Sequence, residues 1–167
     1  MSMTQRILAS WRRPRMVMRG ILAEGPREDR ALVYLMGACF ITFVSQWPVL
    51  SRAAYLDPSV PLEARLGASL LVLLFIAPLI AYAVAALSHV VMRLFGGQGS
   101  FFTARMAMFW AMLATAPLML LYGLLVGFVG PTPAVTVVGT MIFIGFLYQW
   151  GAALRVAEAA PSERGEV

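Results

Sequence analysis

Lysine is absent from this sequence, so all thirteen of its basic side chains are arginine. The chain also has only one cysteine, Cys39, and one histidine, His89, in 167 residues. A single cysteine excludes an intramolecular disulfide and a cysteine-rich metal site, and one histidine cannot hold a metal without further ligands. We therefore expect no metal site, no cofactor and no catalytic residues. Cys39 is expected to fill space in a span, and His89 to bond to the backbone or to a lipid headgroup.

Charged residues are missing from three long stretches, Ala31–Ser51, Leu66–Met92 and Met106–Leu154, which contain 21, 27 and 49 residues. A helix of roughly 20 apolar residues crosses the hydrocarbon core of a bilayer. The first two stretches are therefore each long enough for one span, and the third is long enough for two. With 60% hydrophobic residues and a mean hydropathy of +0.80, the sequence predicts an all-α, polytopic transmembrane bundle of four spans. These stretches also contain no carboxylate that would relay protons with His89.

The predicted transmembrane domain covers residues 30–155, with spans at about 31–50, 66–94, 103–128 and 134–154. A basic segment, residues 1–29, precedes this domain. A short polar tail, residues 156–167, follows it and is expected to fray. A fifth or re-entrant segment would fit into the stretch of 49 residues only if it were very short, and this alternative stays open.

Small residues recur at intervals of four in two of the predicted spans. Ala77, Ala81 and Ala85 fall on one face of the second span. Gly123 and Gly127 form a similar pair near the far end of the third span. In membranes such faces let helix backbones approach each other closely. We expect these five residues to pack helices together, either within the protein or against a partner.

The first thirty residues carry seven of the thirteen arginines, and apolar residues such as Ile7, Leu8 and Trp11 lie between them. This composition is typical of an amphipathic segment at the membrane interface. Pro14 interrupts it, so we expect two short helices, or one that begins near this proline. The alternative is an unstructured basic tail that only sets the orientation. Because a hydrophobic span follows directly, the expected partners are anionic lipid headgroups and not nucleic acid. The candidate phosphate-binding residues of the segment are Arg12, Arg13 and Arg15.

A second candidate site for a lipid phosphate is the glycine-rich connection at residues 96–100, between Arg93 and Arg105. Exposed backbone N–H groups before a helix attract anions, and the two arginines would add charge. The connection lacks the lysine of a nucleotide-binding P-loop. The simpler interpretation is that its glycines end the second span and that Ser100 caps the third.

The distribution of arginine also predicts the orientation of the spans. The N-terminal flank, the glycine-rich connection and the start of the tail at Arg155 are basic, whereas Arg52 and Arg65 in the first connection are offset by acidic residues. Cytoplasmic loops carry the excess of basic residues. We therefore expect both termini in the cytoplasm of a multi-pass protein of the bacterial inner membrane.

The glycine-rich run at residues 96–101, GGQGSF, is followed by Arg105, Trp110 and Pro117. This pattern resembles the Yip1-domain family of small polytopic membrane proteins, in its bacterial branch. The resemblance implies an integral membrane protein with no established cofactor or catalytic residue. Family members usually have five spans, whereas four are predicted here. The Asp-Leu-x-Gly-Pro motif of the eukaryotic branch is absent, so its association with small GTPases is not carried over.

These observations together favour a non-catalytic accessory, scaffold or membrane-organising protein. It would act through helix-helix contacts, with a membrane-protein partner or a second copy of itself, and through contacts with anionic lipids. The alternative is a small transporter or channel component. That function would require a polar pathway lined by several helices.

Overall fold

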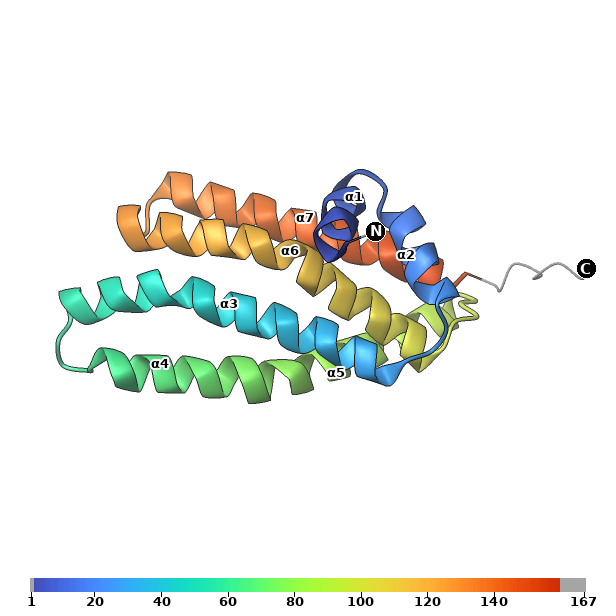
Figure 1. Cartoon of the computed structure of the whole chain (residues 1–167), viewed down its shortest axis with the longest axis horizontal. Coiled ribbons are helices and arrows are strands. Elements are labelled where there is room, and N and C mark those ends of the chain that lie inside the picture. Colours follow the sequence, from blue (N-terminus) through green and yellow to red (C-terminus); the bar gives the residue numbers. More distant parts are fainter. Residues whose placement is uncertain (1, 160–167) are drawn as a thin grey trace, which may run out of the picture.

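The computed structural model describes residues 2–159, and this part of the chain is helical apart from short turns (Figure 1). Its elements are α1 (Met3–Arg12), α2 (Pro14–Ala23), α3 (Glu28–Leu56), α4 (Leu62–Leu71), the π-helical turn η1 (Val72–Ile76), α5 (Ala77–Leu94), α6 (Phe101–Val129) and α7 (Pro133–Ala157). The segments α4, η1 and α5 form one continuous helix, Leu62–Leu94. With α3, α6 and α7, the described residues therefore contain 4 helices that are long and apolar enough to cross a membrane. The prediction of an all-α bundle with four spans is confirmed.

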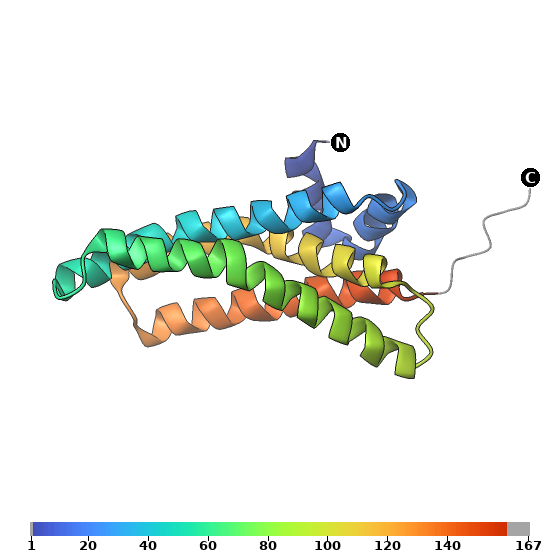
Figure 2. The ribbon, with the colours of Figure 1, turned by 90° about the horizontal axis from the view of Figure 1, so that it is seen from below.

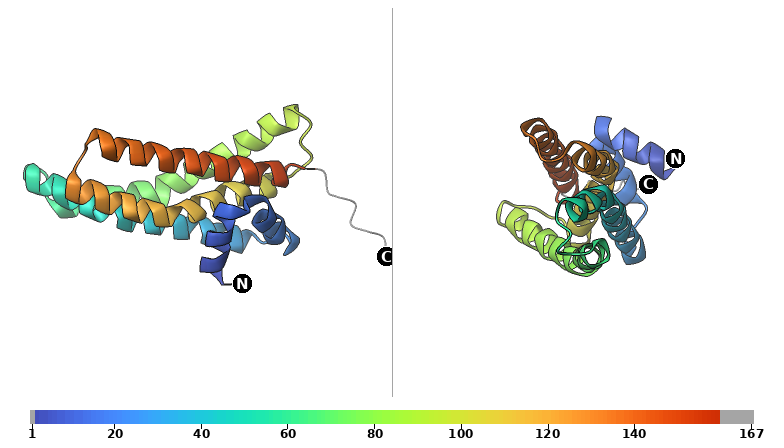
Figure 3. Two further views of the ribbon diagram at one scale, coloured as in Figure 1. Left: turned by 90° about the horizontal axis from the view of Figure 1, so that it is seen from above. Right: turned by 90° about the vertical axis from the view of Figure 1, so that its left-hand side faces the viewer.

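The central helix is α6, which packs against α3, α7 and α5 (Figure 3). Its fully buried Trp110 meets Tyr34 of α3 edge to face, with ring centroids 5.2 Å apart. The neighbouring Phe109 meets Tyr82 of α5 in the same way at 4.9 Å. Such aromatic pairs add specific geometry to the burial of a large apolar surface. The helix at the centre of the bundle is thus held on two sides by aromatic contacts.

The glycines of α6 lie directly on the backbone of α3. A Cβ atom at Gly123 would collide with the carbonyl oxygen of Ser45, and one at Gly127 would collide with the Cβ of Pro48.

The stretch of uncharged residues from 106 to 154 is filled by α6, α7 and the turn between them. It contains no further membrane-length helix in the described chain.

The small residues of α5 lie on the face that meets the bundle. Ala81 and Ala85 are buried in the main core, and Ala77 is half-buried against it. The opposite face exposes large apolar side chains such as Leu79 and Leu87. An apolar outer face of this kind suits contact with lipid.

The two ends of the bundle carry different elements (Figure 1). The helices α1 and α2, the α5–α6 connection and the end of α7 lie together at one end, and the α3–α4 and α6–α7 turns lie at the other. The connection between α5 and α6 contains Gly96, whose φ of 86° lets the chain leave the helix, and Gly97 N–H then donates to the carbonyl of Met92 at 2.8 Å. Ser100 caps α6 through a capping box with Thr103, as predicted.

The first connection is shorter than the sequence suggested. Helix α3 continues through Pro48 to Leu56, and α4 begins at Leu62, so only residues 57–61 lie between the two helices. Arg52, placed in this connection by the sequence interpretation, lies instead in the last turns of α3. Its guanidinium donates to the carbonyls of Gly127 and Phe128 at 3.4 and 3.3 Å. These carbonyls lie at the C-terminal end of α6, where the helix leaves acceptors unpaired and its dipole attracts a cation.

The helix Leu62–Leu94 contains a π-helical turn, Val72–Ile76, just before Pro78. Proline has no N–H and its ring crowds the preceding turn, so the usual hydrogen-bond pattern cannot continue through it. The wider turn absorbs this interruption without ending the helix. The helix leans away from the bundle toward its C-terminal end (Figure 2), where Leu94 and Phe95 are highly exposed.

The last span ends later than predicted. Helix α7 continues to Ala157, and Glu158 beyond it is buried, so the expectation of a frayed tail is wrong for residues 156–158. The physical reason is that the Glu158 carboxylate contacts His89 and Gly99 of the bundle. The remainder of the predicted tail, residues 160–167, lies outside the described residues.

Candidate anion-binding groove

The N-terminal segment forms two short helices that meet at a sharp corner. Arg13 is both the C-cap of α1 and the N-cap of α2, and Pro14 occupies the first position of α2. Proline is tolerated there because the first N–H groups of a helix have no intrahelical acceptor. Two helices broken at Pro14 were one of the two predicted forms, and the alternative of an unstructured tail does not hold for residues 3–23.

The end of α1 is anchored inside the bundle. Ser10 is fully buried, accepts a hydrogen bond from Trp110 Nε1 and donates one to Gln149 Oε1, each at 3.1 Å. The indole N–H of Trp11 donates to the carbonyl of Ala114 at 3.1 Å. This carbonyl lies three residues before Pro117, inside α6. Trp11 therefore binds the bundle itself, in contrast to the expectation that it faces lipid at the interface.

Glu24, just after α2, ties the helix pair to the first span. Its carboxylate lies 2.6 Å from a guanidinium nitrogen of Arg6 in α1 and 2.7 Å from one of Arg30 in α3. The hydrogen bond from Arg6 holds the pKa of this carboxyl below its ordinary value, with a further contribution from the charge of Arg30. The three side chains join three elements at the same end of the bundle.

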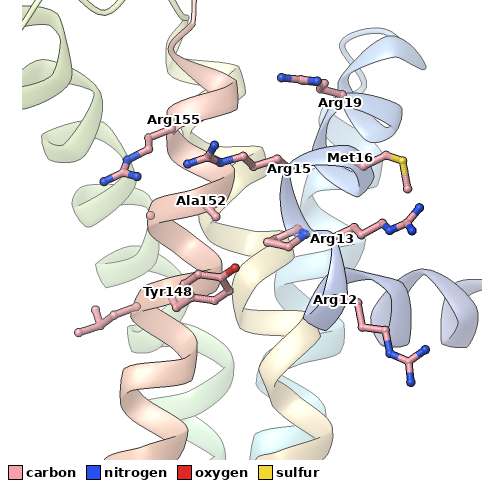
Figure 4. Close-up of a pocket in the computed structure, with 11 residues that line it drawn as sticks. Arg12, Arg13, Arg15, Met16, Arg19, Tyr148, Ala152 and Arg155 are labelled. Carbon is pink, nitrogen blue, oxygen red and sulfur yellow. The ribbon is translucent and has the colours of Figure 1, made fainter.

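A groove of about 570 Å³ lies between this helix pair and α7 (Figure 4). The corner between α1 and α2 forms one wall and the last three turns of α7 form the other. Five of the eleven lining residues are arginines, and none of the eleven is acidic. The lining residues are Arg12, Arg13, Pro14, Arg15, Met16, Arg19, Leu147, Tyr148, Gly151, Ala152 and Arg155.

None of the arginines of this groove forms an ion pair within the described chain, which is also true of Arg52 and Arg93 elsewhere in the bundle. Five of the seven described arginines outside the groove have guanidinium groups that contact carboxylates at 2.6 to 3.3 Å. Helix α2 has no side-chain cap and no acidic residue in its first turn, so the positive end of its dipole is also uncompensated. The uncompensated positive charges of the groove therefore lie on and around α2 and at the end of α7. The paired arginines are Arg6, Arg27, Arg30, Arg65 and Arg105.

The side chains of the groove do not all point the same way (Figure 4). Arg15 and Arg19 extend from α2 toward α7, and the hydroxyl of Tyr148 points toward α2. Arg12 and Arg13 extend away from α7. Arg155 extends from α7 away from α2, so only Arg15 and Arg19 reach from α2 into the centre of the groove, and Arg12 and Arg13 lie at its outer edge.

The structure places the predicted phosphate-binding residues in separate regions. Arg12, Arg13 and Arg15 line the groove, whereas Arg93 and Arg105 do not. Arg105 bonds instead to Glu28 at 2.6 Å and lies 5.6 Å from the ring centroid of Tyr82. Sequence reasoning missed Arg19 and Arg155 as members of the same group. Arg155 had been used only to predict orientation, and nothing in the sequence indicated that α2 packs beside α7.

The glycine-rich connection binds an anion from the chain itself. Glu158 Oε1 lies 2.7 Å from Nδ1 of His89, and its Oε2 accepts a hydrogen bond from Gly99 N–H at 3.2 Å. The carbonyl of Glu158 also accepts from Gln98 N–H at 2.9 Å. The side chains of His89 and Glu158 are both buried. The N–H group that the sequence interpretation offered to a lipid phosphate is thus used by Glu158, and the partner of His89 is this carboxylate instead of backbone or lipid. We call these contacts the Glu158 clasp.

A comparison with protein families decides where this architecture belongs. The model of the Yip1 domain matches residues 8–165, which covers both the groove and the Glu158 clasp. The chain belongs to the Yip1 domain family. Among curated proteins and among solved structures, nothing matches the chain significantly. The Yip1 family is not known for an enzymatic activity.

The match begins inside α1, so the anchored end of this helix is part of the Yip1 domain and not an appendage to it.

The contacts in this bundle explain why the GGQGSF run contains glycine. A Cβ atom at Gly99 would collide with the carbonyl of Ala157 and lie 2.7 Å from Glu158 Oε2, and one at Gly97 would lie 3.0 Å from the same oxygen. The glycines therefore leave room for the end of α7.

A second cavity of about 590 Å³ lies between α3, α6 and α7 of this Yip1 domain. Its walls include Met112, Met119 and Phe143, and none of its lining residues is charged. The hydroxyls of Thr115 and Thr140 donate to carbonyls within their own helices. This cavity is consequently apolar and does not form the polar pathway that a transporter would need.

Proposed function

We propose that this Yip1-family protein is a non-catalytic membrane-organising protein that binds anionic lipid headgroups in the groove between α2 and α7. The single observation that carries this proposal is the group of arginines in the groove, which has no acidic partner in the described chain. Guanidinium groups suit phosphate because they offer several N–H donors in a fixed plane.

The position of the groove supports a lipid ligand. It lies beside the end of a membrane-spanning helix, at the same end of the bundle as the basic N-terminal helices (Figure 1). In the proposed orientation this end faces the cytoplasm of a bacterial cell, where positive residues are enriched and anionic lipids attract them. Both termini and the glycine-rich connection then lie on that side.

The accessory or scaffold role rests on the lipid-facing helices. The outer face of Leu62–Leu94 exposes apolar side chains, and a partner span or a second copy of the chain would pack there in place of lipid. The groove and this outer face would then let the protein organise lipids and helices together.

The test is extraction of the full-length tagged protein in a native polymer, followed by quantification of its retained phospholipids and proteins. We expect enrichment of anionic phospholipid relative to the bulk membrane, and loss of the enrichment in the triple variant Arg15→Gln, Arg19→Gln, Arg155→Gln. Arg93→Gln is the control, because Arg93 is an exposed arginine outside the groove. Equal lipid composition in the triple variant and the wild type would contradict lipid binding at this site. A stoichiometric membrane protein among the retained proteins would support the accessory role, and its absence would contradict it.

A further inference from the structure

The apolar cavity between α3, α6 and α7 lies in one half of the transmembrane bundle. Its lining residues on α6 extend from Met112 to Tyr122, and those on α7 extend from Thr136 to Phe146. In each helix this covers about 15 Å, at a rise of about 1.5 Å per residue. The hydrocarbon core of a bilayer is about 30 Å thick, so the cavity is about as long as one leaflet is deep. It belongs to the half that contains the α6–α7 turn, away from the arginine groove (Figure 1).

The walls of the cavity suit an apolar ligand that arrives from the lipid. None of its described lining residues is charged, and none belongs to the helix Leu62–Leu94, so this helix does not close it. Phe143 in the wall is 58% exposed on the surface of the spans. The hydroxyls of Thr115, Thr136 and Thr140 donate to carbonyls of their own helices, which leaves few groups that could bind water. Apolar cavities stay dry and bind apolar molecules.

The cross-section of the cavity excludes a helix of a partner protein. A volume of about 590 Å³ spread over about 15 Å gives a mean cross-section of about 40 Å². A helix with its side chains is about 10 Å wide, which is about twice this cross-section. A hydrocarbon chain is much thinner than a helix, and it reaches the cavity from the surrounding leaflet without leaving the hydrocarbon.

The hydroxyl of Tyr122 marks the end of the cavity nearest to the α6–α7 turn. It lies against Gly139, where an added Cβ atom would come within 2.7 Å of the phenolic oxygen. In contrast to the threonine hydroxyls of the wall, it has no hydrogen-bond acceptor within residues 2–159. A donor in apolar surroundings is costly unless it is bonded, and the ester carbonyl at the head of an acyl chain would accept from it.

We propose that the cavity binds an acyl chain of a phospholipid from this leaflet, with the ester carbonyl of the chain accepting a hydrogen bond from Tyr122. Burial of the chain against Met112, Met119 and Phe146 drives the binding. Because no charged side chain lines the cavity, the site selects the chain and its ester and is indifferent to the charge of the headgroup. It is independent of the arginine groove, which lies at the other end of the bundle.

The test counts the lipids retained by the full-length protein in native mass spectrometry from detergent, after incubation with diacyl phosphatidylcholine. We expect one tightly retained molecule. Thr140→Trp places an indole in the cavity and should reduce the bound fraction roughly tenfold. Met141→Trp is the matched control and should retain the lipid, because Met141 is the next residue of α7, is 66% exposed and does not line the cavity.

The ester contact is tested by comparing diacyl phosphatidylcholine with its dialkyl ether analogue, which lacks the carbonyls. The wild type should retain the diacyl lipid roughly fivefold more tightly, as one hydrogen bond would give. Tyr122→Phe keeps the ring and removes the donor, so it should retain the two lipids equally. This comparison needs no change in the cavity of the wild type, and it therefore decides the outcome even if Thr140→Trp does not fold.

Three results would overturn the inference. Equal retention by Thr140→Trp and Met141→Trp would show that the chain does not lie in this cavity. A wild type that retains the diacyl and the dialkyl lipid equally would remove Tyr122 from the site. Loss of the retained phosphatidylcholine in the variant Arg15→Gln, Arg19→Gln, Arg155→Gln would assign this lipid to the arginine groove. We expect that variant to retain it as the wild type does, whether or not the groove binds anionic lipid.

Discussion

At the scale of single residues, the buried carboxylate of Glu158 makes a contact that the sequence did not predict. The residue follows the last hydrophobic span in a short polar segment, so composition indicated a frayed tail. Its partner His89 is 69 positions away, and no local pattern links the two. The capping role of Ser100, by contrast, was predictable because a hydroxyl before an apolar helix has a local function. Local chemistry was accessible from the sequence, and contacts between distant elements were not.

The Glu158 clasp makes a prediction about stability. Glu158→Ala removes the carboxylate from buried His89 and leaves Gly99 N–H without its acceptor, and each buried polar group left without a hydrogen-bond partner costs roughly 1–3 kcal/mol. Glu158→Gln keeps an oxygen for Gly99 and should lose less. The free energy of unfolding of both variants is measured in detergent mixtures, with Glu63→Ala, at an exposed position, as the control. If Glu158→Ala unfolded like the control, the clasp would carry no stability.

At the scale of helices, the hydrophobic stretches predicted the four spans because the bilayer requires apolar residues over a fixed length. Small residues also indicated which faces meet, but not which helices they meet. Only the structure shows that Gly123 and Gly127 lie against Ser45 and Pro48 of α3. The packing of α2 beside α7 had no counterpart in the sequence, because charged residues on a helix indicate exposure and not a neighbour.

The contact between α6 and α3 is tested by Gly123→Ala. The added Cβ would collide with the carbonyl of Ser45, so the two helices must separate, and overpacking of this kind costs roughly 1–3 kcal/mol. Gly67→Ala is the matched control. Nothing lies within 4 Å of its Cβ, and alanine is the better helix former. Both are measured by the same unfolding assay, and equal stability of the two variants would show that α6 does not approach α3 this closely.

The docking of α1 should depend on pH through Glu24. The folded-state pKa of this carboxyl lies below its ordinary value because of Arg6, so its stabilising effect is complete above about pH 4.5 and is lost as the pH falls through the lower folded value. The protection of the amides of residues 3–12, measured as their hydrogen exchange relative to the intrinsic rate at each pH, should therefore fall at acidic pH. Glu24→Gln removes the charge and should show low protection that changes little with pH. A wild-type protein whose protection stays constant across this range would argue against the link.

At the scale of the whole molecule, the proposed orientation is open to direct measurement. In a protein with Cys39→Ala, we expect Gln98→Cys in the α5–α6 connection to react with an impermeant maleimide only from the cytoplasmic side. Ser59→Cys, in the turn at the opposite end, should react only from outside. Labelling of intact cells and of inverted vesicles distinguishes the two positions. The reverse pattern would place the arginine groove at the outer surface and remove the basis for the proposed lipid contacts.

The central claim is that an anionic lipid binds between α2 and α7, and thermal unfolding in defined nanodiscs tests it most directly. Binding to the folded state raises Tm. The account predicts a higher Tm for the wild type in nanodiscs with anionic lipid than in phosphatidylcholine alone. The triple variant Arg15→Gln, Arg19→Gln, Arg155→Gln should show no such rise, because the guanidinium groups that would bind the lipid phosphate are gone. An equal rise in Tm for the wild type and the triple variant would contradict the account.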